Sequence, residues 1–188
     1  MDLTQLLSGQ LGNSEWLGKL GQTVGADKSQ VEKAMQLGMP AILKALGGNA
    51  STPDGAAALS NALDRHQDDE VDDAGDFLGK IDMADASKML GHIFSGKQDL
   101  VAGKLAKQSG LDPSQASDLL ARLAPMLMGA LGKQKKTQSV DASGLGGMLG
   151  GLLGQAGGIG GLGKMLDQDG DGDVMDDVQG MLGGFFKK

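Results

Sequence analysis

Residues 110–115 have the sequence Gly-Leu-Asp-Pro-Ser-Gln, which is typical of the turn between two α-helices. Glycine tolerates the left-handed conformation that often ends a helix, so Gly110 predicts the end of a helix that carries Leu105. Asp112 suits the N-cap of the next helix, and the proline after it sits where a missing N–H costs nothing. Gln115 completes a capping box with that N-cap. The stretch therefore predicts a helix-turn-helix unit.

The same pattern occurs 85 residues earlier, where residues 17–47 align with residues 102–132 without a gap. Eleven of the 31 aligned positions are identical, and they are mostly glycines, caps and prolines, as a duplicated supersecondary unit requires. We therefore predict an all-α fold with two helix-turn-helix copies, at about residues 2–50 and 87–133. The identical pairs include Gly18/Gly103, Lys19/Lys104, Leu20/Leu105, Gly25/Gly110, Asp27/Asp112, Gln30/Gln115, Pro40/Pro125 and Gly47/Gly132.

Two prolines and two further caps complete the expected helices. Pro40 and Pro125 each remove one backbone donor, so we expect a break or kink there, followed by a short apolar helix. Thr52 and Asp82 predict the N-caps of two helices between the copies. The side chains expected to face the core are Leu20, Val31, Met35, Ile42, Leu46, Leu105, Ala116, Leu120, Leu127 and Leu131, with Trp16 as an anchor of the first copy.

Composition limits both the core and the chemistry. The 188 residues include four Phe, one Trp and no Tyr, so Leu, Met, Ala, Ile and Val must fill the core, which favours helices. The chain has no cysteine, which excludes disulfides, thiolate metal sites and cysteine nucleophiles. We expect residues 1–136 to form one globular domain, followed by a glycine-rich segment at 137–163 and an aspartate-rich tail at 164–188.

Charge is distributed unevenly along the chain, whose formal net charge is −7. Residues 54–85 carry ten acidic residues against Arg65 and Lys80, a local net charge of −8. Residues 100–136 carry six basic residues against two acidic ones, a net charge of +4. The total charge is therefore a weak argument against polyanionic partners. We expect the acidic run at 67–73, within this connector, to be a solvated loop.

The glycine-rich segment allows three interpretations. Residues 142–163 have no charge and include eleven glycines, yet their apolar residues follow a helical stripe. Each glycine costs about 1 kcal/mol in a helix relative to alanine, so the segment needs a partner surface in order to fold. Packing or self-association through the spacing of Gly147 and Gly151, a flexible linker, and membrane association all remain open.

The tail contains the pattern of a calcium loop. A loop of the EF-hand kind needs oxygen ligands at positions 1, 3 and 5, glycine at 6, a backbone carbonyl at 7 and an apolar residue at 8. Residues 167–174 meet every requirement, whereas position 12 holds Val178 in place of the usual glutamate. A shortened or bent loop would let Asp176 or Asp177 close the site. Calcium is thus the predicted cofactor, with the ligand candidates Asp167, Asp169, Asp171, Asp173, Asp176 and Asp177.

The sequence contains no catalytic motif that is as specific as the calcium-loop pattern. His66 and His92 fall on different expected helices, and His92 is more simply a partly buried residue at the edge of the core. A DNA-reading helix-turn-helix is the alternative, but the helix that would enter the groove offers Ser114, Gln115 and Asp118 in place of a basic face.

The segments Met-Leu-Gly-His-Ile-Phe-Ser-Gly at 89–96 and Leu-Ala-Pro-Met-Leu-Met-Gly-Ala-Leu-Gly-Lys at 123–133 resemble the YidB-like bacterial family of unknown function, a DUF937-type domain. The resemblance covers about residues 1–136, and the aspartate-rich tail also resembles tails of that family. It implies an all-helical, homeodomain-like fold and a bacterial origin, and it implies no activity.

Together these patterns predict a non-enzymatic structural or protein-interaction protein that binds calcium through its C-terminal loop. Nucleic-acid binding by the helix-turn-helix units is the first alternative, and membrane association through residues 142–163 is the second. We expect calcium and a second copy of the chain as partners. The N-terminal residues lack a secretory signal, which makes cytoplasm the expected location, with non-classical export as the alternative.

Overall fold

The structure is a computed structural model that describes residues 14–69 and 74–158. Within these ranges every regular element is a helix, which confirms the all-α prediction. The elements are α2 (Ser14–Val24), α3 (Lys28–Asn49), α4 (Pro53–His66), α5 (Ala74–Lys80), α6 (Met83–Ile93), α7 (Gln98–Ser109), α8 (Pro113–Gln138), the 3-10 turn η1 (Ala142–Gly144) and α9 (Leu145–Gly158).

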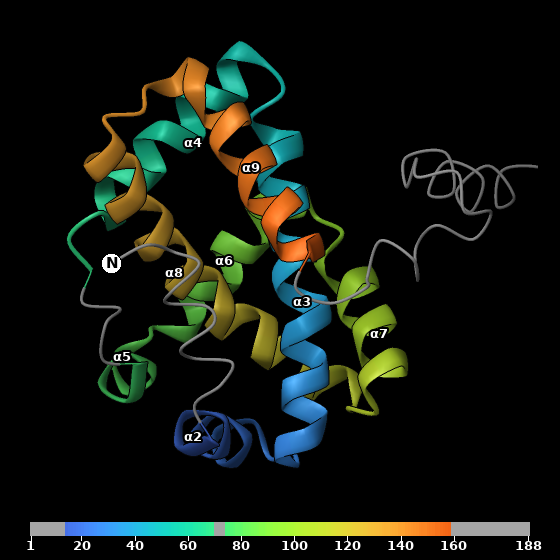
Figure 1. The fold of residues 1–188 in the computed structure, drawn as a ribbon. Coiled ribbons are helices and arrows are strands. Elements are labelled where there is room, and N and C mark those ends of the chain that lie inside the picture. Colours follow the sequence, from blue (N-terminus) through green and yellow to red (C-terminus); the bar gives the residue numbers. More distant parts are fainter. Residues whose placement is uncertain (1–13, 70–73, 159–188) are drawn as a thin grey trace, which may run out of the picture.

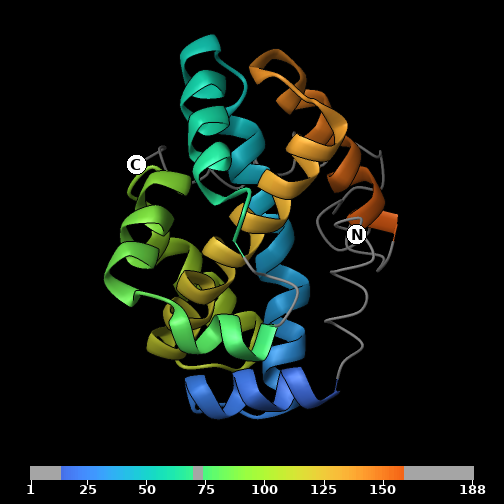
Figure 2. The ribbon, with the colours of Figure 1, turned by 90° about the vertical axis from the view of Figure 1, so that its left-hand side faces the viewer.

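The long helices α3 and α8 form the centre of the fold, and the shorter helices cover them. Helix α2 crosses one end of α3, whereas α4, η1 and α9 gather at the other end (Figures 1 and 2). Helix α7 packs against both long helices, and α6 packs mainly on α8. Each long helix therefore contacts helices from both halves of the sequence.

The two aligned segments have the same succession of elements. In each, a helix ends at a left-handed glycine, Gly25 with φ 70° or Gly110 with φ 81°, and a capped long helix follows. The backbone N–H of Asp27 donates to Gln30 Oε1 at 3.1 Å, and the corresponding bond of the second segment, from Asp112, measures 2.9 Å. Both capping boxes are formed, as the sequence predicts.

The same two glutamines also join the two turns. Gln30 Nε2 donates a hydrogen bond to the carbonyl oxygen of Gly110, and Gln115 Nε2 donates one to the carbonyl oxygen of Gly25. Each amide group thus caps its own helix through oxygen and holds the opposite turn through nitrogen. The sequence predicted the first of these contacts for each glutamine, and the second depends on how the two segments pack.

The core contains every side chain that was expected to face inward. All ten of the predicted core positions have relative exposures of 4% or less, and Trp16 has 3%. The two segments differ strongly in side-chain size at one aligned position of the core, where α3 has Gly38 and α8 has Leu123. A methyl group at Gly38 would lie 3.2 Å from Leu120 Cδ2 and 3.8 Å from Leu123 Cδ1, so α8 and its leucines approach α3 closely here.

The prolines do not end the helices, and the prediction of a separate short helix after each is wrong. Pro40 lies inside α3 and Pro125 lies inside α8. An interior proline costs about 3 kcal/mol. Burial of one leucine stabilises the fold by about 1.5–3 kcal/mol, and the half of α8 that follows Pro125 buries Leu127 and Leu131 among other apolar residues. Tertiary packing therefore outweighs the local penalty.

Apolar residues of the glycine-rich segment also belong to the hydrophobic core. Helix α9 buries Leu145, Met148, Leu149 and Leu152 against α3 and α4, so the partner surface that this segment needs belongs to its own chain. Five glycines of α9 are exposed to solvent, and each destabilises the helix by about 1 kcal/mol relative to alanine. Burial of the four apolar side chains stabilises the fold by more than the sum of these penalties. The exposed glycines are Gly146, Gly147, Gly150, Gly151 and Gly154.

Asp141 caps the turn that leads into α9. Its carboxylate accepts hydrogen bonds from the Ser143 hydroxyl at 2.6 Å and from the Gly144 N–H at 2.9 Å. The Ser143 bond, followed by the Gly144 bond, holds the pKa of Asp141 below its ordinary value. Because the folded pKa lies below the unfolded one, the cap stabilises the fold above the unfolded pKa and loses this effect as pH falls through the folded pKa.

One glycine that the two segments share lies in different surroundings in each. A methyl group at Gly132 would lie 2.5 Å from the Leu63 carbonyl oxygen and 2.9 Å from the backbone nitrogen of Gln67. Nothing lies within 4 Å of the same position at Gly47. Gly132 is therefore the point at which the end of α4 lies directly against α8.

We expect Gly132→Ala to lower the free energy of unfolding by roughly 1–3 kcal/mol, because the added methyl group meets the backbone of α4. Gly47→Ala is the matched control, and it should leave stability unchanged or raise it by up to about 1 kcal/mol. Urea unfolding of both variants measures the difference. Equal effects of the two substitutions would contradict the close approach of α4 and α8.

A second prediction concerns pH and α9. We expect the amides of α9 to lose hydrogen-exchange protection, relative to those of α7, as pH falls below about 4. Asp141→Asn cannot ionise, so its α9 amides should be less protected at neutral pH and should show little of this pH dependence. The same pH profile in both proteins would mean that Asp141 does not hold α9 in place.

Candidate functional site

The predicted calcium loop lies outside the described residues, so the structure does not test it. Its six candidate ligands are Asp167, Asp169, Asp171, Asp173, Asp176 and Asp177, all in the tail. In residues 14–69 and 74–158, no group of three or more histidine, aspartate or glutamate side chains is placed to hold a metal ion. The described part of the acidic connector therefore contains no such group.

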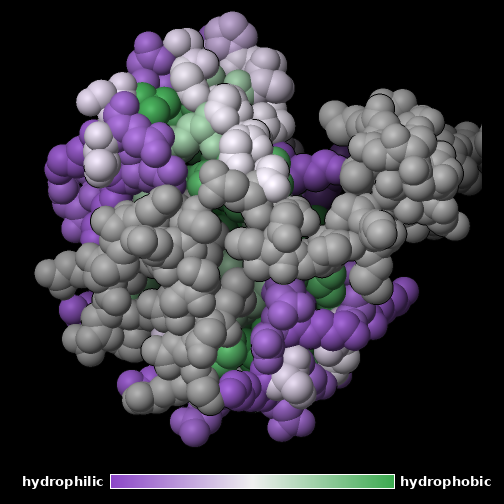
Figure 3. Space-filling view, in the orientation of Figure 1, coloured by the Kyte–Doolittle hydropathy of each residue, from purple (hydrophilic) through white to green (hydrophobic). Residues whose placement is uncertain are grey.

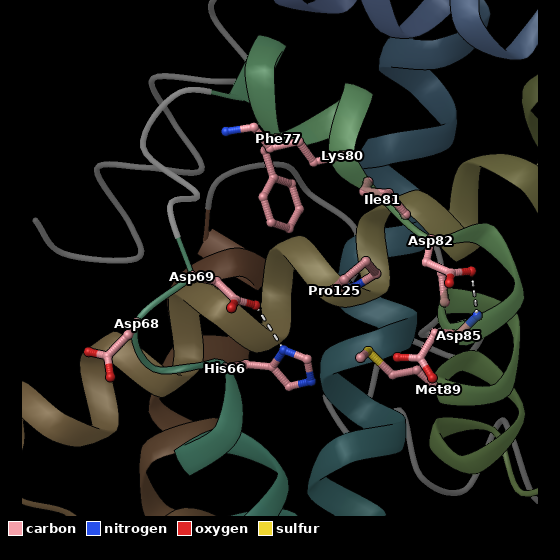
Figure 4. Close-up of a pocket in the computed structure, with 11 residues that line it drawn as sticks. His66, Asp68, Asp69, Phe77, Lys80, Ile81, Asp82, Asp85, Met89 and Pro125 are labelled. Carbon is pink, nitrogen blue, oxygen red and sulfur yellow. Dashed lines mark hydrogen bonds and ion pairs between the residues drawn. The ribbon is translucent and has the colours of Figure 1, made fainter.

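A pocket of about 410 Å³ lies where α4, α5 and α6 meet above α8. Figure 4 shows the Phe77 ring pointing into it from α5, with His66, Met89 and Pro125 on the opposite side. Its apolar lining comes from Phe77, Ile81, Ala86, Met89 and Pro125. Its polar lining comes from His66, Asp68, Asp69, Lys80, Asp82 and Asp85.

Most acidic groups of the pocket already have structural roles. Asp69 Oδ2 lies 2.8 Å from His66 Nδ1, and both side chains are about a third exposed or less. Asp82 caps α6 by accepting from the backbone N–H groups of Ala84 and Asp85 at 2.9 and 3.2 Å. The pocket is thus an apolar floor with an acidic rim, and this chemistry suits a cationic group carried on an apolar stem.

The histidines do not form a catalytic arrangement with each other. His66 ends α4 and faces Asp69, whereas His92 lies near the end of α6. The expectation that His92 would be partly buried is wrong, because its side chain is exposed. Sequence reasoning also missed α5 and with it Phe77, since the short stretch at 74–80 contains two glycines that argue locally against a helix.

The start of α8 is the candidate for a DNA-reading helix, and one of its polar side chains is engaged elsewhere in the chain. Gln115 caps α8 and bonds to Gly25. Asp118 pairs with Arg122 at 3.1 Å. Of the three side chains considered, Gln115 is thus engaged with the other turn, Asp118 is paired within α8 itself, and Ser114 is exposed.

Part of the acidic connector pairs with the basic end of α8. Lys135 Nζ donates to Asp64 Oδ1 on α4, and the Lys135 side chain is only 10% exposed. Lys136 pairs with Asp68 at 2.7 Å, but both of these side chains are largely exposed. The expectation of a solvated acidic loop thus holds for Asp68 and fails for the nearby Asp69, whereas residues 70–73 lie outside the described part.

The helices of the described part offer no membrane span, because none is both long and apolar enough to cross a bilayer. Comparison with models of protein families matches residues 5–134 to a family described as a bacterial protein of unknown function (DUF937). No curated protein matches the chain. No solved structure matches it either.

The neighbouring lysines of α8 give a matched pair of substitutions. We expect Lys135→Ala to lower the free energy of unfolding by roughly 1–3 kcal/mol, since it removes a buried stem and the bond to Asp64. Lys136→Ala should cost about 0.5 kcal/mol or less, because an exposed ion pair contributes little. Chemical denaturation of the two variants provides the comparison, and a larger loss for Lys136→Ala would contradict the burial of Lys135.

Proposed function

Because the chain belongs to this bacterial family of unknown function (DUF937), whose description assigns no task, we propose a role from its own residues. The protein is a non-enzymatic interaction protein whose C-terminal loop binds calcium. Its helical part serves as a scaffold, and its tail responds to the ion.

The observation that carries this proposal is the order of residues in the tail. Asp167, Asp169 and Asp171 occupy the three oxygen-ligand positions of an EF-hand loop, and Gly172 occupies the position of the sharp turn. From residue 167 to residue 177 there are six aspartates and no cation. Carboxylates at this density repel one another strongly, and a divalent ion removes most of that repulsion.

The described helices support a scaffold role. Asp82 and Asp69 are engaged in a helix cap and an ion pair, so these ionisable groups stabilise the fold. Helix α9, which precedes the tail in the sequence, is docked on α3 through four buried apolar side chains.

We also infer that the helices α2–α3 and α7–α8 are two copies of one helix-turn-helix unit. The reciprocal hydrogen bonds of Gln30 and Gln115, each made to the turn glycine of the other segment, support this inference. So does the aligned position of Pro40 and Pro125 inside the two long helices.

Calorimetric titration of calcium into the intact protein tests the proposal. We expect one site with a dissociation constant of about 10⁻⁴ to 10⁻³ M, because the loop lacks the usual glutamate at position 12. The double variant Asp167→Ala, Asp171→Ala should abolish the heat, and magnesium should give much less heat than calcium because it demands smaller octahedral geometry.

The matched control removes two exposed acidic groups elsewhere, in the double variant Asp54→Ala, Asp85→Ala. This variant has the same net charge as the loop variant, and it should bind calcium as the unaltered protein does. Equal heats from all three proteins, or no heat from the intact protein at millimolar calcium, would reduce the loop to an acidic turn.

A further inference from the structure

We propose that the exposed face of α7 is the docking surface for the acidic tail of the same chain, residues 167–178. The surface consists of Leu100 and the three lysines around it, Lys97, Lys104 and Lys107. We call it the α7 lysine face. This inference goes beyond calcium binding and does not depend on it.

The α7 lysine face is narrow and continuous. At 3.6 residues per turn, Leu100, Lys104 and Lys107 follow one another along one side of α7, and Lys97 at the N-cap joins them. The four positions fall within an arc of roughly 80°. The opposite side of α7 is buried through Ala102, Leu105, Ala106 and Ser109.

Leu100 is the unusual member of this face. With 58% relative exposure it is the one large hydrophobic residue that is exposed in the described part of the chain. Figure 3 shows mainly hydrophilic side chains over α7, with a small apolar area among them. A leucine surrounded by lysines suits a segment that offers both carboxylates and an apolar side chain.

The three lysines are available for such a segment. Across residues 14–69 and 74–158, the side chains of Lys97, Lys104 and Lys107 make no ion pair and no hydrogen bond. The lysines at the end of α8 differ, since Lys135 and Lys136 pair with acidic groups of the connector. Asp99 is the one acidic residue of α7, and it lies to the side of the arc, about 100° from Leu100.

The tail has the complementary composition. Its six aspartates lie within eleven residues, from Asp167 to Asp177, with Val174 among them and Val178 directly after them. Opposite charges steer the two segments together, and tethering in one chain raises their effective concentration to the millimolar range. A weak contact between separate molecules therefore becomes a populated one within the chain.

The chain also reaches far enough. Helices α7 and α9 both pack on α3, the long helix at the centre of the fold. Eight residues lie between Gly158 and Asp167, and a fully extended chain of this length spans up to about 30 Å, which is more than twice the width of a helix.

Docking on lysines and binding of calcium would use the same carboxylates. A bound ion neutralises the aspartates and withdraws their oxygens, so calcium should release the tail from the α7 lysine face. The two ideas can nevertheless fail separately, because docking is measured without calcium and release is measured with it.

Spin labelling of the full chain provides the test, and the absence of cysteine makes a single label simple to introduce. With a chelator present, a nitroxide attached to Gln179→Cys should broaden the amide signals of α7. Their intensity should fall below roughly half of the intensity measured after the nitroxide has been reduced. The variant Lys104→Glu, Lys107→Glu should restore most of that intensity, and raising the salt concentration should do the same, because the contact is between exposed charges.

The control variant Lys33→Glu, Lys88→Glu carries the same charge change on α3 and α6, and it should keep the broadening. The double variant Lys104→Gln, Lys107→Gln removes the two charges without reversing them, which guards against damage to α7 by charge reversal. It should reduce the broadening to a level between those of the unaltered chain and the Lys104→Glu, Lys107→Glu variant. Absence of broadening in the unaltered chain, or equal broadening in the Lys104→Glu, Lys107→Glu variant, would overturn the proposal.

Two further arms separate the remaining outcomes. A spin-labelled chain mixed with an isotope-labelled chain that carries no nitroxide detects docking between molecules, and broadening there would overturn an intramolecular contact in favour of a second copy. Added calcium should restore the α7 signals. Broadening that persists at saturating calcium would leave docking established and would count against the release mechanism alone.

Discussion

The contact between the two interhelical turns determines how the halves of this protein fit together. Gln30 and Gln115 each satisfy the exposed N–H at the start of their own helix and the carbonyl of the opposite turn glycine. An amide with both ends engaged has little freedom to rotate, so the starts of α3 and α8 are held at one separation and one angle. The burial of leucines further along both helices follows from that geometry.

Local chemistry made the helix ends predictable. Caps such as Asp82, Thr52 and Asp112 act within three or four residues of their own position, and the left-handed glycines do the same, so a sequence pattern identifies them. The inward faces were predictable for a related reason, since helical periodicity is a property of the segment itself. The structure agrees with the sequence at all of these positions.

The errors arose where distant segments decide the outcome. Pro125 was expected to interrupt α8, but the residues on both sides of it are buried by other helices. The glycine-rich segment lacked a visible partner in the sequence, and α3 supplies it. Phe77 enters the pocket from a short helix whose own composition opposes helix formation, so packing must hold it there. The predicted calcium loop lies in the tail, outside the described residues, and its sequence pattern is what supports it.

The unequal pair Gly38 and Leu123 bears on how such a protein could have arisen. A freestanding dimer of identical units would have to place the same residue at both positions. Two glycines would leave a gap beside Leu120, and two leucines would compete for the space that Gly38 leaves open. Joining the units in one chain removes that restriction, because each side of the interface can then change by itself. If the two segments descend from one unit, as we infer, this asymmetry marks a change that became open to selection only after the two units were joined.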